Sequence, residues 1–396
     1  MRLQLIAMAL VASSAPAIAQ AQASVRTGAS LYEERRGPLN ARAFTTNLDG
    51  RARVSERVEL ALHHEADVIT AASVAVVDSP ADLDAITSAT RMNDVRQRVG
   101  ANVAWEGDSV TVRGGYNYGS ERDYRSHAVQ ASIERRFRDV PLTLNVSGSV
   151  ASDRVCDVAG NGDLDPLDRE RLPNAEGCFS SDERRSAPIR SQGAELALTY
   201  LARRDVAMQL VTSVQRSQGL LSSPYREVWL GPFAAAEHHP STRVRASAAL
   251  GVRVALPRLA GTLRTQLRAY RDSWGINAGS GEVGYQQRLP KGLRLDLRFR
   301  VYRQSGAAFY SDDYAQAPRG QYFTGDRELS PMRNTLGGLA LYWTVPGIDD
   351  QSPVDSLRLA LAFTLARPVF SDFQLGTGSY PNGFWSVSTF SMEVGF

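Results

Sequence analysis

Strict alternation of apolar and polar residues most limits what this chain can fold into. From 293 to 302 the sequence reads Leu-Arg-Leu-Asp-Leu-Arg-Phe-Arg-Val-Tyr, with an apolar residue at every odd position. A helix repeats about every 3.6 residues and would bring apolar residues together in pairs, whereas a strand turns successive side chains to opposite faces. This segment is therefore predicted to be a strand with one apolar and one polar face.

Alternating segments of this kind recur from residue 24 to the aromatic carboxyl terminus, Phe396. Turn residues separate them, as expected for antiparallel strands. The segments lie near residues 24–35, 40–52, 57–70, 94–106, 109–120, 124–138, 141–154, 190–203, 206–219, 242–256, 261–274, 277–289, 292–304, 334–346, 356–369 and 384–396. The sequence therefore predicts an all-β protein, an antiparallel up-and-down β-barrel of about sixteen strands, give or take two.

The connections between these segments alternate between short and long. Short turns such as 107–108 and 204–205 alternate with long connections such as 71–93, 220–241 and 305–333. Outer-membrane barrels have tight turns on the periplasmic rim and long loops on the outer rim. Both termini are then expected on the short-turn rim, which requires an even number of strands.

The amino terminus has the features of a secretory signal. Arg2 precedes an apolar run from Leu3 to Val11, and Ala17-Ile-Ala19 forms a small-residue cleavage site. No later segment approaches the ~18 uninterrupted apolar residues of a spanning helix. We therefore expect residues 1–19 to be a signal peptide, with cleavage after Ala21 or Ala23 as alternatives, and residues 20–396 to be a barrel that crosses the membrane as a closed sheet.

The charge pattern excludes one class of partner. The 45 basic and 42 acidic residues are interspersed, with a net charge of +3 and no basic block. Nucleic acid is therefore not an expected partner.

Many of the arginines fall on the predicted inward faces. They are candidates to line a lumen, where they would select small anionic solutes. The alternative is that they pair with carboxylates across strands and fill the barrel. The lumen candidates are Arg243, Arg245, Arg253, Arg264, Arg268, Arg294, Arg298 and Arg300.

The chain has two cysteines, Cys156 and Cys178, both in the long connection 155–189. In an exported protein they are expected to form a disulfide that brackets this outer loop, with free thiols as the alternative. In the chain-entropy model, a loop of about 20 residues closed in this way contributes roughly 3 kcal/mol.

An acidic stretch within this loop resembles a twelve-residue calcium loop. Its oxygen-bearing residues fall at positions that can converge on one hard cation, and Gly162 stands at the required turn. Ala159 occupies a usual ligand position, and the loop ends in Asp where Glu is usual. The alternative is an acidic loop without metal. The candidate calcium ligands are Asp157, Asn161, Asp163, Asp165 and Asp168.

No catalytic motif points to an enzyme. Gly279–Gly284 matches a dinucleotide fingerprint by spacing, but it lies in a predicted antiparallel strand and opens no helix.

Aromatic residues near the predicted outer strand ends, including Tyr116, Tyr270, Trp274 and Tyr302, suggest an interfacial girdle.

Several motifs, in order, resemble a family of unknown function found in Gram-negative bacteria and predicted to form outer-membrane barrels. They are Asp67-Val-Ile-Thr-Ala-Ala-Ser73, Tyr118-Gly-Ser-Glu-Arg-Asp-Tyr124, Ser223-Pro-Tyr-Arg-Glu-Val228, Tyr270-Arg-Asp-Ser-Trp-Gly275, Tyr302-Arg-Gln-Ser-Gly-Ala-Ala-Phe-Tyr310 and Asp326-Arg-Glu-Leu-Ser330. The closing strand ending in Phe also resembles the terminal signature of such barrels. The resemblance implies a location in the outer membrane, in contact with its lipid, and no reaction. Relatives are often encoded near thioredoxin-like and flavin-transferase proteins.

Two functions follow as expectations. The first is a passive, porin-like channel for small ions or solutes, with an arginine-rich lumen. The second is a closed barrel that serves as an envelope scaffold for periplasmic redox or assembly partners. An outer-membrane hydrolase ranks third, and we predict no enzyme and no certain cofactor.

Overall fold

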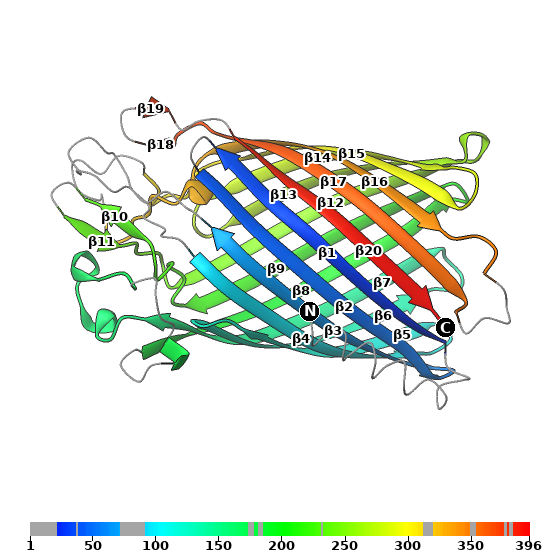
Figure 1. The fold of residues 1–396 in the computed structure, drawn as a ribbon, viewed down its shortest axis with the longest axis horizontal. Helices are drawn as coiled ribbons and strands as arrows, with labels where there is room; N and C mark the ends of the chain where they lie inside the picture. The colour runs from blue at the N-terminus through cyan, green and yellow to red at the C-terminus, as the bar shows by residue number, and fades with distance from the viewer. Residues whose placement is uncertain are drawn as a thin grey trace.

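Sixteen antiparallel strands close into one barrel in the computed structural model (Figure 1). The structure describes residues 22–36, 39–71, 92–172, 178–180, 185–230, 233–311, 320–348, 354–375, 378–379 and 383–396. The predicted signal peptide, residues 1–19, lies outside these ranges. No helix of the described chain is long and apolar enough to cross a membrane.

Each barrel strand pairs with the next in chain order, and the last pairs with the first. The barrel strands are β1 Ala23–Arg36, β2 Leu39–Ser55, β3 Val58–Ala71, β4 Met92–Glu106, β5 Val110–Ser120, β6 Tyr124–Arg136, β7 Leu142–Asp157, β8 Arg185–Arg203, β9 Val206–Gly219, β12 Thr242–Leu256, β13 Gly261–Asp272, β14 Asn277–Arg288, β15 Leu293–Gln304, β16 Met332–Thr344, β17 Ser356–Phe370 and β20 Phe384–Gly395. The all-β prediction and the strand number are both confirmed.

The structure differs from the prediction mainly at the long connections. β7 runs to Asp157 and β8 begins at Arg185, so both extend into the predicted loop 155–189. Two small sheets also form within predicted loops. They are β10 Glu227–Trp229 with β11 Ala234–Ala236, and β18 Gln374–Leu375 with β19 Gly378–Ser379. Their strands are two or three residues long, too short to show a period in the sequence.

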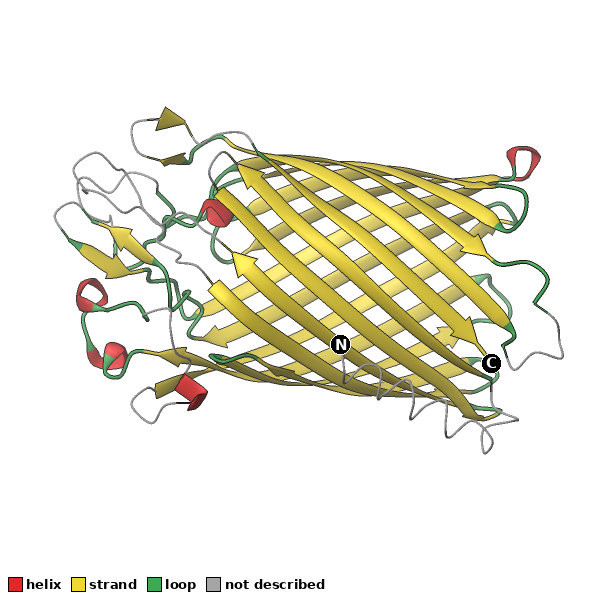
Figure 2. Ribbon diagram, viewed as in Figure 1, coloured by secondary structure: helices red, strands yellow, loops and turns green. Residues whose placement is uncertain are grey.

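The predicted alternation sets which residues face outward. Large apolar side chains along the strands are exposed on one face, for example Leu62 at 66%, Leu267 at 67% and Leu361 at 59%. The long connections gather at the left-hand end of Figure 2 and the tight turns at the other, where the carboxyl terminus lies. Phe396 exchanges two backbone hydrogen bonds with Ala23 there, which closes the seam between the two ends of the sheet.

Candidate functional site

The eight candidate arginines lie on one sector of the inner wall. They come from β12, β13 and β15, which with β14 are four neighbouring strands, and they alternate with the exposed apolar residues of the outer face. Arg253, Arg268, Arg294 and Arg298 remain exposed to solvent although they face inward. The interior beside them is therefore hollow.

Two of the eight arginines pair with carboxylates. Arg243 Nε donates to Asp272 Oδ2 at 2.9 Å, and Arg264 pairs with Asp296. Ion pairs with carboxylates therefore do not account for all of the inward arginines.

The other six have neutral partners or none within the described chain. Arg245 donates to Gln215 at 3.3 Å, Arg298 donates to the Thr364 hydroxyl at 3.0 Å, and Arg294 stacks 4.1 Å over the Tyr342 ring. Arg300 lies 5.9 Å from the Tyr302 ring centre, while Arg253 and Arg268 have no partner. This sector keeps most of its positive charge.

The opposite sector is different, because most of its inward carboxylates are paired, Glu59 and Asp67 being the exceptions among the described side chains. Halfway around the closed sheet, on β2 to β6, inward acids contact bases on the same or nearby strands. These pairs are Asp49–His63 at 2.6 Å, Glu65–Arg98 at 3.5 Å, Glu106–Arg53 at 3.3 Å and Glu134–Arg113 at 3.5 Å. The inner wall is thus positive on one side and close to neutral on the other.

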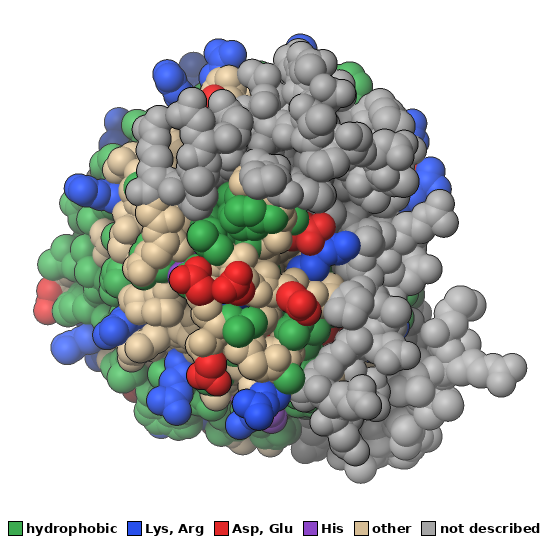
Figure 3. All heavy atoms as spheres, turned by 90° about the vertical axis from the view of Figure 1, so that its left-hand side faces the viewer, with side chains coloured by type: hydrophobic (Ala, Val, Ile, Leu, Met, Phe, Trp, Pro, Cys, Tyr) green, Lys and Arg blue, Asp and Glu red, His purple; other side chains and the backbone are tan. Residues whose placement is uncertain are grey.

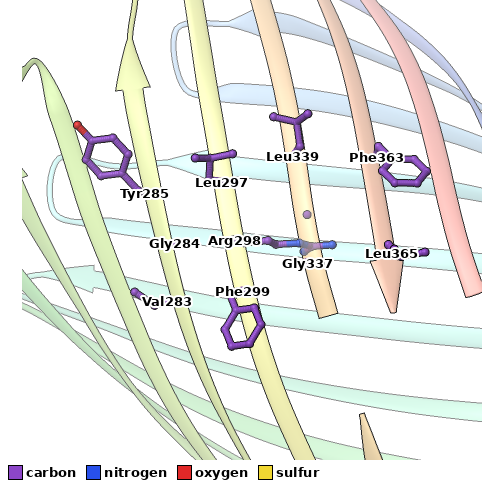
Figure 4. A pocket seen from close by; sticks show the side chains of 11 residues that line it. Val283, Gly284, Tyr285, Leu297, Arg298, Phe299, Gly337, Leu339, Phe363 and Leu365 are labelled. Carbon is purple, nitrogen blue, oxygen red and sulfur yellow. The ribbon is translucent and has the colours of Figure 1, made fainter. Parts of the chain in front are cut away.

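Inward glycines make room for the arginine side chains. A Cβ at Gly338 would lie 2.7 Å from Arg298 Nε, and one at Gly284 would lie 3.2 Å from Arg264 Nε. Figure 4 shows Arg298 extending from β15 across to the neighbouring strand. Both arginines therefore run along the wall over a glycine.

Two hollows line the inner wall toward the short-turn end. One, of about 410 Å³, includes Arg51, Asn102, Gln130 and Asn145. Another, of about 200 Å³, includes Arg253 and Glu282. A third, of about 480 Å³, has an almost wholly apolar lining that includes Leu297, Phe299 and Phe363 (Figure 4), and those side chains belong to the outer face.

At the other end, the long connections pack into one cap. His238 and Phe323 exchange backbone hydrogen bonds of 3.0 and 2.9 Å, which joins the β11–β12 and β15–β16 connections. Phe323 is fully buried with Val228 and Leu230. In Figure 3, apolar and acidic side chains of the described residues lie across the middle of this end.

Further contacts tie the cap to the rest of the rim. Leu172 N donates to Pro224 O at 2.7 Å, and Tyr225 donates to Asp123 of the β5–β6 turn. Arg327 contacts Glu34 on the inner face of β1 at 2.9 Å. The cap therefore connects segments from several sides of the barrel mouth.

A buried carboxylate lies at the centre of the cap. The Glu237 side chain has no exposed surface, accepts from Ser223 N at 2.7 Å and accepts from the Thr324 hydroxyl at 2.9 Å. Arg226 Nη1 lies 3.6 Å away, and the His239 ring lies 3.4 Å away without a hydrogen bond. Burial alone would raise the pKa of Glu237, but the His239 and Arg226 charges and the hydrogen bond from Ser223 N lower it.

Sequence reasoning missed this carboxylate, and it misplaced several aromatics. Trp274 is buried and contacts Arg243 at 4.1 Å, while Tyr270 and Tyr302 face the interior below the cap. They do not form an outward girdle, although Tyr116 does face outward. The hydrogen bond from Thr324 to Glu237 spans 87 residues, so no local pattern indicates it.

The predicted disulfide is present, and it is buried. Cys156 and Cys178 are bonded, and they pack with Leu172, Phe179 and Tyr225. The disulfide therefore joins the end of β7 to the β7–β8 connection, and Tyr225 of the cap packs against it.

The candidate calcium loop is held by its own contacts. Asp157 accepts from Asn161 at 3.0 Å and pairs with Arg169 at 3.3 Å, while Asp165 accepts from Leu167 N. Asp163 and Asp168 are exposed. The described chain contains no group of three or more His, Cys, Asp or Glu side chains placed to hold a metal ion, and calcium binding by this loop stays a prediction.

Comparison with known proteins identifies a fold and a family. No curated protein matches the sequence. The structure is similar to a bacterial polysaccharide outer membrane secretin, with 8% identity, 94% of this chain and 98% of that chain covered, and a TM-score of 0.51. It is also similar to OccD3 (OpdP) of Pseudomonas aeruginosa, with 11% identity, 93% and 91% coverage and a TM-score of 0.44.

OpdK of Pseudomonas aeruginosa, solved with vanillate, is a further similar structure. It is 10% identical over 96% of this chain and 100% of that chain, with a TM-score of 0.45. At such identities the likeness is one of fold. The family model described as "Protein of unknown function (DUF3570)" matches residues 2–352, and the chain therefore belongs to this family of unknown function.

Proposed function

We propose that this protein is a channel of the Gram-negative outer membrane that passes small anionic solutes. The observation that carries the proposal is the inner sector of arginines, most of which have no carboxylate partner. A charged wall beside a hollow interior attracts ions of opposite sign and lowers their entry barrier.

The outer wall supports the membrane location. Exposed apolar side chains such as Leu62, Val150 and Leu361 occur on the outer faces of strands around the barrel. Apolar surface on this scale is unfavourable in water and favourable in lipid. A closed sheet also leaves no backbone edge unpaired within the bilayer.

The cap favours a second candidate, a closed barrel that serves as an envelope scaffold. Buried Phe323 and Leu230 and the fully buried Glu237 make the cap a packed element. In a channel, the cap narrows the outer mouth and limits solute size. In a scaffold, it seals the mouth.

Single-channel recording separates the two. The refolded protein is placed in planar bilayers under a salt gradient, and ion selectivity is read from the reversal potential. Steady openings that favour anions are expected for the channel. Silence from a barrel shown to be folded by its shifted gel mobility would refute the channel and leave the scaffold.

A further inference from the structure

The outer wall carries arginines at its loop-bearing end, and the proposed channel does not require them. Six arginines lie on the face of the exposed apolar side chains, near the loop-bearing ends of β8, β9, β13, β15, β16 and β17. All are exposed, and none has a partner in the described chain. They are Arg190, Arg216, Arg271, Arg303, Arg333 and Arg367, here called the arginine collar.

The collar begins where the apolar surface ends. Val301, 47% exposed, precedes Arg303 by two residues, and Leu365, 44% exposed, precedes Arg367 by two. Residues two apart share a face and are separated by about 7 Å along a strand. The Arg303 and Arg367 guanidinium groups therefore lie one step beyond the apolar band, at the level of lipid headgroups.

Carboxylates do not neutralise the collar. On this face, in the loop-side half of the described strands, Glu33 is the only acid. It is already bound by Arg42 at 3.1 Å and Arg35 at 3.3 Å. Figure 3 views this end and shows most Lys and Arg side chains near the circumference, with acids nearer the centre.

Two collar arginines face each other directly. Arg303 of β15 and Arg333 of β16 are register partners, so their Cβ atoms lie about 5 Å apart. Like charges in this position destabilise a sheet unless an anion lies between them. Two guanidinium groups at this spacing can both donate to one phosphate.

We propose that the arginine collar binds the phosphate groups of an anionic lipid in the leaflet around the loop-bearing rim. The partner must carry phosphate beside acyl chains, because the guanidinium groups lie against the apolar band. This inference rests on the proposed membrane location. The outer wall then binds lipids that carry phosphate in preference to lipids that do not.

The test measures binding of lipid A to the refolded full-length protein by native mass spectrometry. Lipid A is compared with its dephosphorylated form, which has the same acyl chains. R303Q/R333Q removes two collar charges, and R204Q/R258Q removes two exposed arginines at the opposite rim as a matched control. Each arginine near a lipid surface contributes about fivefold in affinity, so R303Q/R333Q should bind lipid A roughly 25-fold more weakly.

The expected result is a preference for the phosphorylated form that R303Q/R333Q loses and R204Q/R258Q keeps. Equal binding of the two forms, or an unchanged affinity in R303Q/R333Q, would overturn the proposal. Displacement of lipid A by millimolar inorganic phosphate would assign the collar to free phosphate and also overturn it. A barrel that conducts ions but does not prefer phosphorylated lipid A refutes lipid binding by the collar and leaves the channel intact. A barrel that is silent but keeps the lipid preference refutes the channel and leaves lipid binding intact.

Discussion

Single glycines on the inner wall decide how far the arginines reach into the lumen. Gly338 stands directly opposite Arg298, and Gly284 lies between Arg264 and Arg298 in the same cross-strand row. With no Cβ at either position, each arginine can lie along the wall. The conformational freedom of glycine is not what matters here; the missing side chain is.

Gly338→Ala should narrow the lumen. Its Cβ would lie 2.7 Å from Arg298 Nε, so the side chain must leave the wall and project inward. We expect a lower single-channel conductance with anion selectivity retained. Gly337→Ala is the matched control, since a Cβ there has no neighbour within 4 Å. Equal conductance in both variants would show that Arg298 does not lie over Gly338.

Glu237→Gln should loosen the cap without unfolding the barrel. The buried carboxylate accepts from Ser223 and Thr324, and a neutral amide weakens both bonds and leaves Arg226 less neutralised. We expect a loss of about 2 kcal/mol in the cap. Hydrogen exchange should quicken in the described parts of 220–241 and 305–331 and stay unchanged in the strands. Glu227→Gln, which alters a partly exposed pair with Arg171, should change exchange less.

The same carboxylate makes a pH-dependent contribution to the stability of the cap. Its pKa in the folded cap is lowered to about 2, below the value of about 4.3 for an unfolded Glu. Its stabilising contribution is therefore fully present above pH ~4.3 and is lost as the pH falls toward 2. Protection factors in the cap, which correct hydrogen exchange for its intrinsic pH dependence, should fall over that range in the wild type, and Glu237→Gln should lack this part of the pH dependence.

At the scale of elements, the β7–β8 connection links the barrel to the cap. Its disulfide packs against Tyr225, and Ala236 N donates to Arg169 O of the same connection at 3.0 Å. The strands themselves are held by continuous backbone ladders that need neither contact.

The variant C156S/C178S should therefore destabilise the cap and spare the barrel. Losing a cross-link between residues 22 apart removes roughly 3 kcal/mol in the chain-entropy model. We expect faster protease cleavage in the 155–189 connection, with the heat-modifiable gel mobility of the barrel unchanged. Cleavage at the wild-type rate would mean that the packing of Leu172 and Tyr225 suffices to hold the connection.

At the scale of the whole molecule, charge is distributed by face and by end. The interior is positive along β12, β13 and β15, and the outer wall is apolar with arginine near the capped rim. Reversing the interior charge with R298E/R300E should shift the reversal potential from anions toward cations. R203E/R204E at the short-turn rim is the control, and it should keep the anion preference. Unchanged selectivity in a conducting R298E/R300E barrel would contradict the lumen assignment.

The sequence by itself determined the strands, their faces and the two kinds of rim. A period of two needs only neighbouring residues, so Leu293 to Tyr302 shows its outward and inward sides without any partner strand. Tertiary structure alone decided which inward charges are paired, since register belongs to pairs of strands. It set Arg298 against Gly338 and Arg303 against Arg333. It also built the cap, because Glu237 meets Thr324 across 87 residues of chain and no local sequence pattern indicates that contact.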